Sequence, residues 1–236
     1  MPSIPRFLSR EIGPIPSTIH LDPEESVHCV RVLRLSAGDP ICLIDGKGTC
    51  AEAVILKADP KATLVSLSRK EFSEPRSNLE LVFGVTKPPA LESIFRKCTE
   101  LGVRSFQPLF TEHSVRLGGW NEERWNKIIM EACKQCQDPW IPTLKNPLKF
   151  EDWMNLRSLS APLVFCDENY RAPQKSIPLN GNAHILVGPE GGWSDREREW
   201  VTAQDAFPLS LGPNRLRAET ACLVALTLIK SKINEL

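Results

Sequence analysis

The chain of 236 residues contains no long hydrophobic run. Its longest apolar stretch, Ala221 to Ile229, is far shorter than the roughly 18 to 20 residues that a helix needs to cross a bilayer. No positively charged segment followed by an apolar one stands at the N-terminus, where prolines at positions 2, 5, 14 and 16 interrupt the pattern. We therefore expect a cytoplasmic protein without membrane spans.

An excess of charge of either sign is also missing, because 29 Lys and Arg balance 29 Asp and Glu. A basic total is typical of nucleic-acid-binding domains, so the overall charge gives no sign of such a partner. Binding of a polyanion would depend on a local group of arginines, since electrostatic attraction follows the local arrangement of charges.

The eight cysteines do not form the pattern of a disulfide framework or a zinc site. Most lie inside apolar helix or strand patterns, and the chain lacks the short, secreted character of a disulfide scaffold. Cys133 and Cys136 form one C-x-x-C, but a structural zinc site needs four ligands and no second pair accompanies them. The sequence predicts reduced thiols and no metal.

The usual phosphate-binding patterns, G-x-x-x-x-G-K-[ST] and G-x-G-x-x-G, are absent as well. Instead, the loop Gly188 to Gly192 follows an apolar strand at His184 to Val187, and the loop Gly212 to Asn214 follows a short strand at Phe207 to Leu211. Open α/β sheets bind ligands at the carboxyl ends of their strands, so these loops are expected to meet in one pocket. A nucleoside ligand without phosphates fits best, and ordinary tight turns are the alternative.

Helix signals follow both loops. Ser194 and Glu197 form a capping box. A second helix is expected from about Arg217, with Glu219 in its first turn, where the helix dipole favours an acid. This last helix is apolar nearly all round, which predicts a central or interface position.

The strand and helix patterns predict two domains. Residues 1–70 hold one helix, Pro23 to Arg34, and short strands at Pro40 to Ile44, Thr49 to Lys57 and Ala62 to Leu67, which is typical of a small β-barrel. The turn Asp45 to Gly48 is expected to join the first two strands as a hairpin. Residues 71–78 are polar and are expected to be a linker. Residues 79–236 alternate strands with helices, which predicts an α/β fold with a mostly parallel sheet. Before the two glycine loops, the expected elements of this part are strands at Leu79 to Val85, Ser105 to Phe110 and Leu163 to Cys166 and helices at about Ala90 to Leu101 and Glu122 to Cys136. The apolar positions of the first helix are Val27, Val30, Val32 and Leu33.

Taken together, these motifs resemble the RsmE family, the small-subunit ribosomal RNA uridine N3-methyltransferases of the SPOUT superfamily. The resemblance spans nearly the whole chain and rests on HCVRVLR, GDPICLIDGKG, GVTK with CTELGV, EACKQC, VGPEGGWSDRE and LGPNRLRAETA. It implies a PUA-like N-terminal barrel, a C-terminal SPOUT domain with a trefoil knot, and a homodimer. It also implies methyl transfer from S-adenosylmethionine to N3 of a uridine in the decoding region of 16S rRNA.

The cofactor residues implied by the resemblance lie in the two glycine loops and at the helix after the second. Backbone and apolar groups there are expected to surround adenosine, although Thr220 could bond only its own backbone. They are Leu186, Val187, Gly188, Pro189, Gly191, Gly192, Leu211, Gly212, Leu216 and Thr220.

Methylation of N3 requires loss of the imide proton and stabilisation of the resulting anion. Glu190 is the first candidate for the carboxylate that accepts or orients the proton, and capping a turn is its alternative role. Glu219 is the second candidate, although the helix dipole would weaken it as a base. Arg217 is expected to stabilise the anion or bind a phosphate, with an ordinary ion pair as its alternative.

RNA contacts are expected from a set of cations, Arg6, Arg31, Arg34, Lys47 and Arg215, each of which could also be a solvated surface charge. His28 adjoins Arg31, and a packed structural role is favoured for it. The chain departs from the family pattern, as we interpret it, at Gln137 to Trp140, where Trp140 could stack on a base.

Two other functions stay open at this point. The altered loop at Gln137 to Trp140 and the zero net charge favour a non-catalytic RNA-binding or ribosome-associated module. A SPOUT methyltransferase for another RNA site, or for a ribose hydroxyl, is the other alternative.

Overall fold

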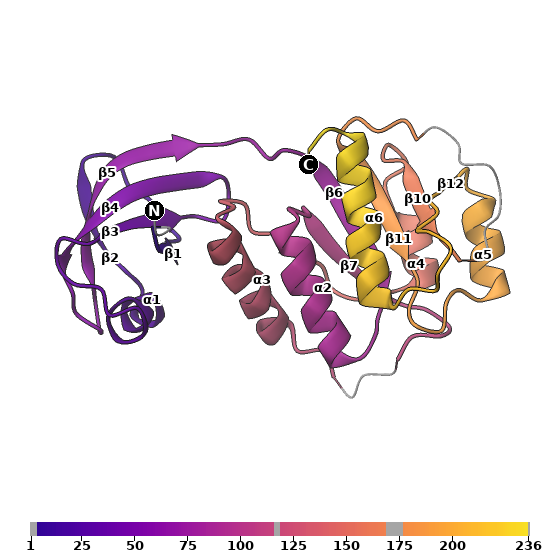
Figure 1. Ribbon diagram of the computed structural model, residues 1–236, viewed down its shortest axis with the longest axis horizontal. Coiled ribbons are helices and arrows are strands. Elements are labelled where there is room, and N and C mark those ends of the chain that lie inside the picture. Colours follow the sequence, from indigo (N-terminus) through magenta and orange to yellow (C-terminus); the bar gives the residue numbers. More distant parts are fainter. Residues whose placement is uncertain (1–3, 116–118, 169–176, 236) are drawn as a thin grey trace. The chain divides into compact units, whose positions relative to one another are not determined.

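The computed structural model describes residues 4–115, 119–168 and 177–235 (Figure 1). The chain forms two compact units. The first comprises Met1–Pro75 together with Cys133–Ile141, and the second comprises Arg76–Ala132 and Pro142–Leu236. None of the helices in the described part is long and apolar enough to cross a membrane.

The first unit is built on a five-stranded sheet with the order β1-β3-β4-β5-β2. Buried side chains, including Phe7, Leu43 and Ile55, form its core. The strands β1 and β2 were not among the expected elements, and β5 continues into the segment expected as a linker. The elements are β1 (Arg6–Leu8), β2 (Ser17–His20), α1 (Pro23–Val27), the π-helical turn η1 (His28–Val32), β3 (Pro40–Ile44), β4 (Thr49–Lys57) and β5 (Leu64–Phe72).

The hairpin between β3 and β4 has the turn that its Asp-Gly sequence predicts. Asp45 Oδ1 accepts hydrogen bonds from the backbone N–H of Lys47 at 2.7 Å and of Thr49 at 2.9 Å. Gly46 and Gly48 have φ of +74° and +100°, which other L-residues rarely adopt. The turn and its register therefore follow from local sequence.

The first helix differs from the prediction. Its α-helical part ends at Val27, a π-helical turn follows, and Arg34 adopts a positive φ of 56°. Val27, Val32 and Leu33 are 40%, 61% and 40% exposed, so the expected apolar face is wrong at these positions. The buried residues are instead Glu25, Ser26 and Cys29, and the Ser26 hydroxyl both donates to Leu21 O and accepts from Thr63 N. The hydrogen bond with Thr63, 37 residues away in the chain, fixes a polar residue on the buried face of the helix.

The prediction that all thiols are reduced is also wrong for one pair. Cys42 on β3 and Cys50 on β4 are joined by a disulfide bond, with their Cα atoms 6.6 Å apart. The hairpin brings the two residues close together. Cys50 on β4 pairs with Ile44 on β3, and Cys42 lies two residues before Ile44 on the same strand.

Residues 133–141 return to the first unit, a feature that the expected ranges 1–70 and 79–236 did not include. Lys134 Nζ lies 2.8 Å from Glu25 Oε1, and both side chains are largely buried. Trp140 Nε1 donates to Ser73 O at 2.8 Å, and its ring meets Phe72 edge to face. Polar and aromatic contacts therefore hold this segment in place.

The second unit is an α/β domain with a parallel sheet of order β12-β10-β11-β6-β7-β8, in which β9 also pairs with β7. Its fold class is the one expected. The elements are β6 (Asn78–Gly84), α2 (Pro88–Glu100), β7 (Ser105–Phe110), α3 (Glu122–Cys136), β8 (Thr143–Leu144), β9 (Leu148–Lys149), α4 (Phe150–Leu156), β10 (Leu163–Cys166), β11 (Asn182–Val187), α5 (Asp195–Thr202), β12 (Phe207–Pro208) and α6 (Ala218–Lys232).

Helices cover both faces of this sheet (Figure 1). The helices α2 and α6 pack side by side over one face, where Phe83 of β6 meets Phe95 of α2. Val82, Phe165 and Leu186 belong to a core cluster on the other face together with side chains of α4 and α5. Strands buried on both sides carry apolar residues on both faces, which explains the continuous apolar sequence of β10 and of Ile185 to Val187 in β11.

Three elements of this unit were not predicted, namely β8, β9 and α4, and β12 ends at Pro208 rather than Leu211. The backbone N–H of Leu209 still donates a hydrogen bond to Phe165 O, so the chain leaves the sheet after Leu209. Ser210 and Leu211 therefore belong to a loop rather than to β12.

Candidate functional site

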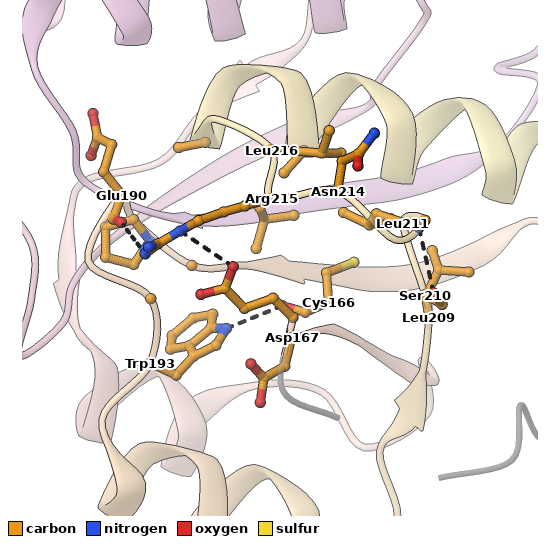
Figure 2. Close-up of a pocket in the computed structure, with 18 residues that line it drawn as sticks. Cys166, Asp167, Glu190, Trp193, Leu209, Ser210, Leu211, Asn214, Arg215 and Leu216 are labelled. Atoms are coloured by element: carbon orange, nitrogen blue, oxygen red, sulfur yellow. Dashed lines mark hydrogen bonds and ion pairs between the residues drawn. The ribbon is translucent and has the colours of Figure 1, made fainter. Parts of the chain in front are cut away.

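A pocket lies at the carboxyl ends of β10 and β11 and beside the loop that follows β12 (Figure 2). Open parallel sheets bind their ligands at this place, because the strand ends there expose backbone groups that the loops can direct at a ligand. Its lining residues are Cys166, Asp167, Glu168, Val187, Gly188, Pro189, Glu190, Gly192, Trp193, Leu209, Ser210, Leu211, Gly212, Asn214, Arg215, Leu216, Ala218 and Ala221.

The glycine loop after β11 forms one wall and is closely packed. Gly192 has φ of +70°, and its N–H bonds Pro189 O at 2.9 Å, which closes a turn. A Cβ on Gly191 would lie 2.7 Å from His113 Cβ, so only glycine fits there without a shift. The shape of this wall therefore depends on its glycines.

The helix after this loop is anchored as the sequence predicts. The Ser194 hydroxyl accepts from Glu197 N, and the Glu197 carboxylate accepts from Ser194 N at 3.0 Å. The other oxygen of Glu197 accepts from Glu112 N at 2.9 Å, although the two residues are far apart in the chain. The capping box thus also ties the loop after β7 to the pocket wall.

The opposite wall is the loop from Leu209 to Leu216. Gly212 has φ of +107°, and its N–H bonds the Ser210 hydroxyl at 3.4 Å. The helix α6 begins where it was expected, with Arg217 as its N-cap residue, and the Arg217 side chain makes no capping hydrogen bond. Backbone groups and leucine side chains therefore dominate this wall.

The charges at the pocket form separate pairs. Asp167 is almost fully buried and accepts from Arg198 Nε at 2.5 Å. Glu168 Oε2 lies 3.3 Å from Arg215 Nε, and Arg215 Nη2 donates to Glu190 O at 3.4 Å. Among the described lining residues, Arg215 is the one cation, and Asp167, Glu168 and Glu190 are carboxylates. Such a lining is unsuited to a polyphosphate.

Cys166 also borders the pocket, but its thiol is not reactive there. Burial raises the pKa of Cys166 to about 12, so the thiol is neutral near neutral pH. Its carbonyl oxygen instead accepts a hydrogen bond from Trp193 Nε1 at 3.2 Å, which positions the indole (Figure 2). Covalent catalysis by this cysteine is therefore not supported.

The structure brings most of the predicted cofactor residues together in this pocket. Those that line it are Val187, Gly188, Pro189, Gly192, Leu211, Gly212 and Leu216. Three others are not among the lining residues: Leu186 is buried in the sheet core, Gly191 packs on His113, and Thr220 is exposed in the first turn of α6. Their roles as cofactor ligands stay predictions.

The three predicted catalytic residues differ in whether they line the pocket. Glu190 lines the pocket, and its carboxylate accepts a hydrogen bond from the Thr86 hydroxyl. Arg217 is exposed and Glu219 is half-buried at the start of α6, and neither is among the lining residues. Of the three, Glu190 is the one among the described lining residues, and Figure 2 shows its carboxylate pointing away from Arg215.

The predicted RNA-binding cations divide between the two units. Arg31, Arg34 and Lys47 are exposed in the first unit, where Arg6 donates to Gln137 O. Arg215 belongs to the second unit and lines the pocket. His28 is half-buried against Phe7, consistent with the packed role favoured for it.

The strand β10 contributes lining residues that the sequence reasoning missed. Cys166, Asp167 and Glu168 stand at its carboxyl end. The strand itself was predicted, so the rule that ligands bind at strand ends could have identified them. The other missed residues are Trp193, Leu209, Ser210, Asn214, Ala218 and Ala221.

The described residues contain no group of three or more His, Cys, Asp and Glu side chains that could hold a metal ion. The carboxylates at the pocket bind arginine and threonine side chains.

The chain has the two domains of an RNA methyltransferase with a PUA domain. Residues 73–230 match the family model of the RNA methyltransferase domain, and residues 21–68 match that of the RNA methyltransferase PUA domain. Two relatives are each called ribosomal RNA small subunit methyltransferase E. That of Synechocystis is 32% identical over 92% of this chain and 74% of its own length, and that of Bacillus subtilis is 31% identical over 90% and 89%. The chain belongs to this family, the ribosomal RNA small subunit methyltransferase E proteins.

Solved structures have the same fold. The Neisseria gonorrhoeae ribosomal RNA small subunit methyltransferase E bound to S-adenosylmethionine (SAM) aligns with a TM-score of 0.89 at 24% identity, covering 98% of both chains. A Legionella pneumophila protein in complex with bound SAM aligns with a TM-score of 0.83 at 26% identity, also over 98% of both chains.

Proposed function

We propose that the protein is a SAM-dependent methyltransferase that methylates N3 of a uridine in the decoding region of 16S rRNA. The observation that carries the proposal is the pocket between the two glycine-bearing loops, in a chain of this family. Its walls offer backbone groups and leucines for an adenosine, and its described lining holds three carboxylates and one cation. Because Arg198 and Arg215 pair with Asp167 and Glu168, the charge that these pairs leave over is the carboxylate of Glu190, which suits a sulfonium cofactor better than a phosphate ligand.

SAM, when bound, supplies the methyl group. Val187 to Pro189, Leu211 and Leu216 would contact its adenosine through backbone hydrogen bonds and apolar surface. The observation that supports this fit is the backbone of the two loops, which lines the pocket at Gly188, Gly192 and Gly212 without side chains to fill it.

The protein must remove the proton from N3 of the uridine and stabilise the anion that results. Glu190 is the first candidate for accepting or orienting this proton, because the residue lines the pocket and its carboxylate, which points away from Arg215 in Figure 2, is held at the pocket edge by Thr86. Arg217, exposed at the start of α6, is the candidate that stabilises the anion, and Glu219 is the second candidate for the proton.

The first unit would contribute to RNA binding. It carries Arg31, Arg34 and Lys47 as exposed cations, and Arg6 on β1. A uridine in folded RNA must be separated from its neighbours before N3 is reached, so a properly folded RNA is required rather than a free base. With this ribosomal RNA substrate, the proposed location of the protein is the cytoplasm.

We also propose that the protein is a homodimer. The helix α6 packs against α2 and the sheet, yet Leu223, Val224 and Leu228 stay partly exposed on it. A second copy could cover these apolar side chains, as the family resemblance implies. Sedimentation velocity should give twice the mass of 26.4 kDa, and a Leu228→Glu variant should be monomeric with unchanged circular dichroism.

Two measurements test the function. Calorimetry should detect SAM binding to the protein or to its RNA complex. The absence of binding to both would exclude the proposed SAM-dependent methyltransferase activity. Nucleoside analysis of 16S rRNA from a strain lacking the gene should lose N3-methyluridine and regain it on complementation. Persistence of that nucleoside, with no redundant enzyme, would exclude this substrate and favour another RNA site.

A further inference from the structure

Glu168 and Arg215 form an ion pair at the pocket although they belong to segments far apart in the chain. Glu168 follows β10, and Arg215 precedes α6. Arg215 Nε lies 3.3 Å from Glu168 Oε2, and both side chains line the pocket. Figure 2 shows the Arg215 side chain extending from the side of Leu216 and Asn214 across the pocket toward Glu190, whose carbonyl it reaches at 3.4 Å.

This pair is easily separated. The side chains of Arg215 and Glu168 are 69% and 45% exposed, and ion pairs so exposed contribute little to stability. The hydrogen bond from Arg215 to the Glu190 carbonyl is long at 3.4 Å. A ligand that offers both charges in return could therefore displace the pair at little cost.

The other two carboxylates of the described lining are held more firmly. The side chain of Asp167 is 2% exposed and bonded to Arg198, which also contacts Asp195 at 2.8 Å and Trp193 O at 3.2 Å. Glu190 accepts the hydrogen bond of Thr86, a fully buried residue. Glu168 is therefore the carboxylate with the greatest freedom to turn toward a ligand.

We propose that Arg215 and Glu168 recognise the zwitterionic amino-acid end of SAM. The guanidinium binds the α-carboxylate, the Glu168 carboxylate binds the α-ammonium, and the internal ion pair opens as the ligand enters. The planar fork of arginine matches a carboxylate through two parallel hydrogen bonds. The proposal rests on the function proposed above, and it assigns Arg215 to the cofactor rather than to RNA.

Three ligands separate the contributions of the two side chains. SAM carries both charges of the amino-acid end, decarboxylated SAM keeps the ammonium alone, and 5′-methylthioadenosine lacks that end. Calorimetry with each ligand should be carried out on the wild type, Arg215→Ala, Glu168→Gln and the control Arg196→Ala. Arg196 is an exposed arginine of α5 that is not among the lining residues.

We expect Arg215→Ala to weaken SAM binding roughly tenfold, the loss typical of one charge-assisted hydrogen bond, and to leave decarboxylated SAM no weaker. Glu168→Gln should weaken both amino-bearing ligands by a similar factor. Binding of 5′-methylthioadenosine should stay unchanged in every variant, which also verifies that the pocket is folded. Arg196→Ala should behave as the wild type with all three ligands.

An unchanged preference for SAM over decarboxylated SAM in Arg215→Ala, with 5′-methylthioadenosine still bound, would overturn this assignment alone. Weaker RNA binding by that variant at unchanged SAM affinity would overturn it too and identify an RNA contact. Failure of the wild type to bind any of the three ligands would overturn the proposed function and this inference together.

Discussion

The hydroxyl of Thr86 donates a hydrogen bond to Oε1 of Glu190, which joins the end of β6 to the glycine loop after β11. Thr86 is fully buried, whereas Glu190 is exposed at the pocket. A fixed donor therefore limits the orientations of the carboxylate that we propose for the proton transfer. The contact makes Thr86 a positioning residue, since it acts through Glu190.

Thr86→Val should lower kcat for methyl transfer about tenfold or more, because small misplacements of a catalytic group are costly. The substitution keeps the volume and removes the hydroxyl. Thr86→Ser is the matched control and should retain most of the activity. SAM affinity, measured by calorimetry, should be unchanged in both. Equal loss of activity in the two variants would show that the hydrogen bond does not position Glu190.

Arg217→Ala should lower kcat by about 10²- to 10³-fold, the loss seen when one donor to a developing anion is removed. Cofactor affinity should change much less, because Arg217 is exposed and lies outside the pocket lining. Arg196→Ala provides the matched control. Equal losses in methyl transfer and in SAM binding would instead identify Arg217 as a cofactor-binding or folding residue.

Glu80→Gln should make stability less dependent on pH. Burial alone would raise the pKa of Glu80, but hydrogen bonds from His184, 2.7 Å away, and from Lys145 outweigh burial and lower this pKa. A carboxyl with a lowered pKa stabilises the fold above its unfolded value of about 4.3, and this stabilisation is lost as the pH falls through the folded value.

Urea unfolding at about pH 7 should therefore show Glu80→Gln to be less stable by roughly 1 to 3 kcal/mol. The difference from the wild type should shrink as the pH falls below about 4. Glu199→Gln, at an exposed position of α5, should show no such difference. A loss for Glu80→Gln that is the same at every pH would contradict the role of its ionised form.

Cys136 should be the cysteine that iodoacetamide modifies most readily. Of the cysteines outside the disulfide, five are buried and Cys136 is partly exposed. A hydrogen bond with the Cys133 side chain lowers the pKa of Cys136 to about 7. Because the thiolate is the nucleophile, the modification rate should rise through about pH 7 and level off above it.

Peptide mapping at several pH values would measure this rate, and Cys136→Ser should lose the labelled peptide. A midpoint near the ordinary thiol value of 9.0 would contradict the effect of Cys133.

Several features of the fold follow from local sequence. The capping box of Ser194 and Glu197, the turn after Asp45 and the start of α6 after Arg217 all have the predicted form. Each depends on residues within a few positions of one another. The two glycine loops were also predicted to meet, because the carboxyl ends of parallel strands lie at one edge of the sheet.

Short elements and buried faces were predicted less well. The strands β8 and β9 have two residues each, too few for a pattern to be recognised. The face of α1 was predicted incorrectly because Glu25 is buried by pairing with Lys134, more than 100 residues later. Charged residues are rarely buried unless they are paired, so a pattern of apolar and polar residues predicts that Glu25 is exposed when its distant partner is unknown.

By itself the sequence determined the α/β class of the second unit, the positions of most helices and strands, and two glycine loops suited to a phosphate-free nucleoside. Local backbone preferences and apolar patterns are sufficient for those conclusions. Only the tertiary structure decided that Thr86 holds Glu190 and that Glu168 faces Arg215 at the pocket. Such contacts join distant segments, so they depend on how the strands are ordered in the sheet, which no local pattern specifies.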